Sequence, residues 1–101
     1  MTPTEKLAID IFSNRYGTNL NSRFEKLKEE SDELIEAYND YMLGDGTYEH
    51  VIDELGDVKA VLTHISGILQ IDQDKLLLDA IIKSEVRQHI PNFKRKNDPS
   101  T

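Results

Sequence analysis

Residues 24–65 read FEKLKEESDELIEAYNDYMLGDGTYEHVIDELGDVKAVLTHI, and the rest of the architecture follows from this segment. On both sides of Gly44-Asp45-Gly46, apolar residues recur every three or four positions, which is the period of an amphipathic helix. Two glycines within three residues indicate a tight turn. Helices joined by so short a turn lie side by side and antiparallel. The segment therefore predicts a long helical hairpin.

Two further helices flank this hairpin. Thr2-Pro3-Thr4-Glu5 has the pattern of a capping box with proline at the first helical position. Ser22 begins a second capping box, and Asp72 is a suitable cap for a last helix that Pro91 ends. We predict helices over residues 3–16, 22–43, 47–69 and 73–90. The predicted fold is all-α and four-helix-bundle-like over residues 1–91, followed by a polar tail at 92–101.

The composition excludes several classes of function. The chain of 101 residues carries a net charge of -7, which disfavours general nucleic-acid binding because that needs a basic surface. It has no apolar run near the roughly 20 residues of a membrane span. It has no cysteine, and its start lacks the pattern of a signal peptide, so we expect a cytoplasmic protein. Because so short a chain has a small core, we expect a homodimer or homotetramer.

Two acidic pairs stand out in the hairpin. Glu30 and Glu33 are three residues apart, and so are Glu54 and Asp57, so each pair lies on one helix face. Glu54 falls in the middle of the apolar face of its helix, and Glu30 lies between Leu27 and Leu34. A carboxylate at a core position is costly unless a positive charge neutralises it. This placement predicts a cation between the two helices.

The chemistry of the expected site follows from its ligands. The two pairs lie at similar distances from the turn, so the antiparallel helices bring them to nearly the same level. Oxygen-only ligands suit Mg²⁺, with Mn²⁺ as a possible substitute. Lys83 and Arg87 lie one turn apart on the last predicted helix. Because lysine and arginine hold phosphate oxygens well, we expect a polyphosphate ligand.

These segments resemble the MazG-like all-α NTP pyrophosphohydrolases. The family pattern is E-E-x-x-E followed, after a variable gap, by E-x-x-D. Here it is matched by residues 29–33 (EESDE) and 54–57 (ELGD), with a looser match at 83–87 (KSEVR). The resemblance implies Mg²⁺-dependent attack of water between the α and β phosphates of an NTP or dNTP, which releases the monophosphate and pyrophosphate. It implies that the metal ligands are Glu30, Glu33, Glu54 and Asp57, that one of these or Glu29 orients the water, and that Lys83 and Arg87 bind phosphate.

The nucleobase stays open at this stage. Phe12, Tyr16 and Phe24 flank the start of the second helix and either stack on a base or pack in the core. A dUTPase-like or dCTPase-like enzyme is one possibility. A phosphoribosyl-ATP pyrophosphohydrolase is another, although Val61 and Leu62 replace the tyrosine–histidine pair typical of that group. The competing interpretations are a non-enzymatic helical dimerisation module and a nucleotide-binding sensor.

Overall fold

The computed structural model describes residues 1–89, and its regular secondary structure over this range consists of α-helices. The helices are α1 (Pro3–Tyr16), α2 (Leu20–Met42), α3 (Tyr48–Ile68) and α4 (Gln73–Gln88). No strand occurs among these residues, so the predicted all-α class is confirmed. Ile90 and the predicted tail at 92–101 lie outside the described residues. None of the helices within 1–89 combines the length and the apolar character that crossing a membrane requires.

The helices begin where side chains cap them. Thr2 Oγ1 accepts a hydrogen bond from the Glu5 amide, so α1 has its predicted bounds. The predicted start of α2 at Ser22 is wrong by two residues, because Asn19 Oδ1 accepts a hydrogen bond from the Ser22 amide and so caps the helix earlier. Asparagine caps at least as well as serine, and both were present in the sequence. Thr47 and Asp72 cap α3 and α4.

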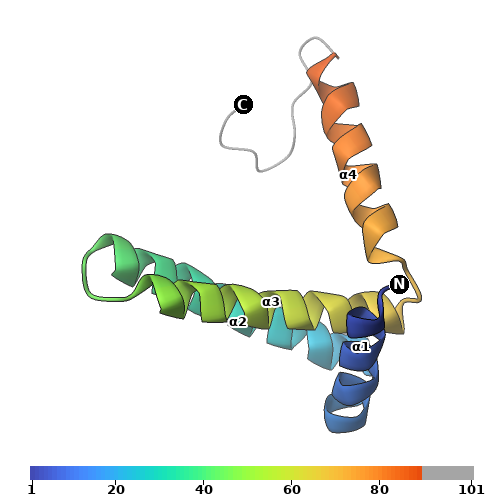
Figure 1. Cartoon of the computed structure of the whole chain (residues 1–101), viewed down its shortest axis with the longest axis horizontal. Coiled ribbons are helices and arrows are strands. Elements are labelled where there is room, and N and C mark those ends of the chain that lie inside the picture. The colour runs from blue at the N-terminus through green and yellow to red at the C-terminus, as the bar shows by residue number, and fades with distance from the viewer. Residues whose placement is uncertain (90–101) are drawn as a thin grey trace.

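Helices α2 and α3 form the predicted antiparallel hairpin (Figure 1). Gly44 has φ +82°, a left-handed conformation that glycine adopts at little cost. The amides of Asp45 and Gly46 both donate to the carbonyl oxygen of Asp40, which closes the turn. The turn therefore fixes which residues of the two helices face each other.

Helix α1 crosses α3 near the end of the hairpin that lies far from the turn (Figure 1). The closest approach is at Gly67, where an added Cβ would lie 2.6 Å from Ile9 Cγ1. At Gly56, by contrast, an added Cβ would meet nothing within 4 Å, so no other helix of the chain approaches closely there. Gly67 is the glycine on which the packing of α1 depends.

Helix α4 extends away from the other three helices (Figure 1). None of its residues is buried. Among the described residues, the buried apolar side chains are Ala37, Val61 and Ile65, and all three belong to the hairpin. The four predicted helices are thus arranged as three packed helices and one extended helix.

Candidate metal centre

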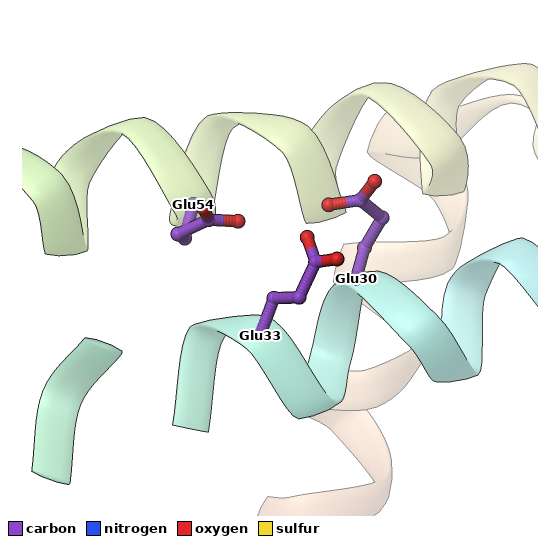
Figure 2. Close-up of side chains that lie close together, drawn as sticks. All are labelled: Glu30, Glu33 and Glu54. Carbon is purple, nitrogen blue, oxygen red and sulfur yellow. The ribbon is translucent and has the colours of Figure 1, made fainter. Parts of the chain in front are cut away.

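The hairpin brings acidic side chains of α2 and α3 together. Figure 2 shows Glu30 and Glu33 of α2 and Glu54 of α3 directed into the space between the two helices. One carboxylate oxygen from each residue lies within 4.8 Å of the other two. Three members of the predicted quartet therefore form one cluster, which we call the acidic centre. Asp57 is exposed and lies outside this group, although it borders the pocket beside Glu30.

Two of these carboxylates are buried without full compensation. Glu30 is 8% exposed, and the side chain of Glu54 is 14% exposed. Within residues 1–89, the Oε2 atoms of both are buried and accept no hydrogen bond. A buried, unsatisfied charged oxygen costs several kcal/mol. A bound cation would supply the positive charge that these carboxylates lack, and ligands that are all oxygen atoms suit Mg²⁺ or Mn²⁺.

A basic side chain lies near the other oxygen of each buried carboxylate. Lys26 Nζ lies 3.2 Å from Glu30 Oε1 and 3.4 Å from Glu29 Oε1. The hydrogen bond to Glu30 is the main reason that the pKa of Lys26 is raised. On the other helix, His50 Nε2 lies 3.8 Å from Glu54 Oε1. The protein thus supplies part of the positive charge that the acidic centre requires.

The pKa of Glu33, the third member of the acidic centre, is raised by its neighbours. A hydrogen bond with Glu30 is the largest cause that raises the pKa of Glu33. Partial burial and the negative charges of Glu30, Glu54 and Glu29 raise the pKa further. Crowded carboxylates retain a proton more readily because ionising all of them brings like charges together. A bound divalent cation would remove the need for that proton.

A pocket of about 160 Å³ adjoins the acidic centre between α1, α2 and α3. Its polar walls are Arg23, Lys26, Glu30 and Asp57, and its aromatic walls are Phe12 and Tyr16. These two aromatic residues belong to the set for which the sequence leaves open stacking on a base or packing in the core. The third, Phe24, does not line this pocket and is 50% exposed.

The cations beside the acidic centre differ from those that the sequence suggested. Lys83 and Arg87 belong to α4, which extends away from the hairpin (Figure 1). Arg23 and Lys26 lie at the pocket instead, and sequence reasoning missed both. The signal was available, because residues 23, 26 and 30 have the i, i+3, i+7 spacing of one helix face.

His64 has a structural role behind this pocket. It is 0% exposed, and its Nε2 is 3.1 Å from the hydroxyl of Ser13. Its ring centroid lies 6.0 Å from that of Phe12. Burial lowers the pKa of His64, and the positive charge of Arg23 lowers it further. A neutral histidine thus joins α3 to α1.

Comparison of this chain with protein-family models, with curated proteins and with solved structures finds no match. The resemblance to MazG-like enzymes therefore stays a prediction from residues 29–33, 54–57 and 83–87.

Proposed function

We propose that this protein is a Mg²⁺-dependent nucleoside triphosphate pyrophosphohydrolase, which converts an NTP or dNTP and water into the monophosphate and pyrophosphate. The observation that carries the proposal is the acidic centre. Its buried Oε2 atoms on Glu30 and Glu54 have no hydrogen-bond donor within residues 1–89. Evenly solvated surface acids would not show this. The match of residues 29–33 and 54–57 to the family pattern supports the same reaction.

The residues would divide the work as follows. Glu30, Glu33 and Glu54 would hold the cation. Asp57, one turn beyond Glu54, would join them when the cation binds. When bound, Mg²⁺ supplies the positive charge that makes water acidic and offsets the charge of a triphosphate. Glu29 or a member of the quartet would orient the attacking water. Lys26 would limit the net negative charge that an approaching phosphate meets.

The test is pyrophosphate release from a panel of NTPs and dNTPs, with Mg²⁺ and with a chelator. We expect turnover with Mg²⁺ and its loss in Glu54→Gln, which keeps the shape of the side chain but removes its charge. The matched control is Asp53→Asn, a neighbouring exposed acid on the same helix, which should retain turnover. Full turnover by Glu54→Gln, or a wild-type protein that is inactive with Mg²⁺, would exclude the proposed reaction at this site.

We also propose that the protein is a homodimer or homotetramer in which a second copy covers α4. The large apolar residues of α4 are 45–63% exposed, for example Leu77 at 63%, Ile81 at 52% and Val86 at 53%. Fully burying each such side chain is worth about 1.5–3 kcal/mol. The same surface favours the second candidate function, a non-enzymatic helical dimerisation module, which would associate without hydrolysing any triphosphate.

The oligomeric state can be measured by light scattering. We expect a stable oligomer for the wild type and dissociation for Ile81→Asp, because a charge in an apolar interface is costly. The exposed polar position Asp79 on the same helix provides a control, and Asp79→Asn should leave the oligomer intact. A monomeric wild-type protein at micromolar concentration would refute self-association. An oligomer that releases no pyrophosphate would favour the non-enzymatic module.

A further inference from the structure

The connection between α3 and α4 directs α4 away from the other helices. The amides of Gln70 and Ile71 donate hydrogen bonds to the carbonyl oxygens of Gly67 and Ser66, and Gln70 has φ +57°. This is the pattern of a Schellman motif, in which a left-handed residue ends a helix and turns the chain. Among residues 1–89, Gln70 is the one non-glycine residue with positive φ. The direction in which α4 leaves α3 is therefore set at this connection.

The first turn of α4 is then held on α3. Gln73 Oε1 accepts hydrogen bonds from Lys59 Nζ, 2.6 Å away, and from Thr63 Oγ1, 3.4 Å away. A connection of two to five residues between helices usually gives an antiparallel pair. Here α4 projects away instead (Figure 1), and extended packing among the described residues occurs between α2 and α3 and between α1 and α3. Its own bundle therefore leaves α4 uncovered.

A groove between α1 and α3 holds no helix within the described residues. Two cavities of about 240 and 350 Å³ form it, and Glu5 and Lys59 line both. The wider cavity reaches Leu76 and Leu77 at the base of α4. Small side chains contribute to the walls of the narrower cavity, namely Thr4, Ala8, Ala60 and Thr63. Because small side chains let helix axes approach closely, this groove has the lining that a packed helix needs.

The apolar surface of α4 indicates what kind of neighbour covers it. The large apolar residues spread over more than half of the circumference of the helix at 100° per residue. They are Leu76, Leu77, Leu78, Ile81, Ile82 and Val86. A helix that is apolar on most sides is normally buried among several helices. Pairing of two α4 helices would cover only one side of each, whereas a groove formed by two helices provides wider cover.

The area that such an arrangement buries suits a stable interface. Two α4 helices and the two grooves that receive them would remove roughly 1,000 Å² of apolar surface from water, since the six large apolar residues of each helix are 45–63% exposed. Apolar atoms make up about 60% of a typical interface, so the total is roughly 1,600 Å². This is the size of a standard specific interface. A second copy of the chain can therefore supply enough surface.

We infer that two copies of this chain exchange their α4 helices, so that the α4 of each copy lies in the groove between α1 and α3 of the other. The inference rests on the self-association proposed above and names the surface that receives α4. Such an exchange makes, between two copies, the packing that a hairpin of α3 and α4 would make within one. Short connections under backbone strain favour exchange, and the positive φ of Gln70 is such a strain.

Spin labelling tests the exchange in the full chain. The chain contains no cysteine, so Asp79→Cys creates a single site for a nitroxide label at an exposed position of α4. The labelled copy is mixed in urea with an isotope-labelled wild-type copy, and the two are refolded together, so that NMR detects only effects between copies. We expect the label to broaden the amide signals of Ala8 and Ala60 more strongly than those of the turn at 44–46.

Two results of this measurement would overturn the inference. Broadening of α4 signals without the groove signals would show that the α4 helices pair with each other. No broadening between copies would show that α4 reaches no second copy.

A substitution in the groove provides the second measurement. Ala8→Glu places a charge where an apolar helix would cover it, which is costly. The dimer dissociation constant from analytical ultracentrifugation should rise about tenfold or more. Asn14→Glu adds the same charge at an exposed position of α1 and is the matched control, which should dimerise as the wild type does. A folded Ala8→Glu protein that dimerises as tightly as the wild type would overturn the inference. Should this variant not fold, the spin-labelled mixture decides.

The outcome for the exchange is distinguishable from the outcome for the proposed function, because neither measurement involves a nucleotide. Exchanged helices without pyrophosphate release would support the groove and refute the proposed reaction. Pyrophosphate release by a protein that does not exchange α4 would refute the groove while the reaction stands. Pairing between α4 helices would refute the exchange but not self-association, whereas a monomer would refute both.

Discussion

Replacing Glu54 by glutamine should make the metal-free protein more stable. The carboxylate oxygens of the acidic centre lie within 4.8 Å of one another. At an effective dielectric constant near 20, two unit charges at that distance repel by about 3.5 kcal/mol. Lys26, whose Nζ lies 3.2 Å from Glu30 Oε1, offsets part of this repulsion. We therefore expect Glu54→Gln to raise the free energy of unfolding by about 1–2 kcal/mol in a chelator, or roughly 5–15 °C in melting temperature.

Adding Mg²⁺ should reverse the order of stability. A cation that binds only the folded state stabilises it by about 2.7 kcal/mol at a hundredfold excess over its Kd. Glu54→Gln has one charged ligand fewer, so Mg²⁺ should stabilise it much less than it stabilises the wild type. Thermal unfolding by circular dichroism, measured in a chelator and in increasing Mg²⁺, reports both effects. Asp53→Asn should resemble the wild type in both conditions, because Asp53 is solvated.

One result would refute this reasoning directly. If Glu54→Gln lowers the melting temperature by the same amount with and without Mg²⁺, Glu54 is stabilised by contacts within the protein. The acidic centre would then have no need of a cation.

Two other predictions concern the helices that support the site. Burial and then Arg23 lower the pKa of His64, so the unfolded chain takes up this proton more readily than the folded protein. The stability due to His64 should therefore be present above about pH 6.5 and lost as the pH falls through the lowered pKa. The free energy of unfolding, measured with urea, should accordingly vary with pH in this range. His64→Gln should flatten this pH dependence, whereas His89→Gln, at an exposed position, should not. Gly67→Ala should destabilise the protein by about 1–3 kcal/mol because its Cβ would overlap Ile9. Gly56→Ala, where nothing lies within 4 Å of the added Cβ, should stabilise it by about 0.5–1 kcal/mol. If Gly67→Ala and Gly56→Ala change the melting temperature equally, the assigned packing of α1 on Gly67 is wrong.

Local patterns predicted the features of this protein that depend on one helix or one turn. The bounds of α1 followed from its cap, and the hairpin followed from the two glycines at the turn. The burial of Glu30 and the near-burial of Glu54 followed from their places on apolar helix faces, because a helical period fixes which residues share a side. These predictions needed no knowledge of distant contacts.

The features that depend on the packing of separate elements were beyond the sequence. An apolar face predicts that α4 will be covered, but it does not say by what, so Lys83 and Arg87 were placed beside the acids too readily. Similarly, both Gly56 and Gly67 lie within α3, and only the crossing of α1 distinguishes them. Arg23 was overlooked because an arginine near a helix start is usually solvated, whereas here α1 packs over it.

The order of charges along α2 gives the strongest reason to connect the pocket with the acidic centre. From Arg23 through Lys26 to Glu30 and Glu33, one face of the helix changes from positive to negative over ten residues, or about 15 Å. Under the proposed function, a triphosphate at this pocket would meet carboxylates, which repel its phosphates in the absence of a cation. Triphosphates should then bind only with metal. This polarity would explain why the proposed reaction depends on a divalent cation.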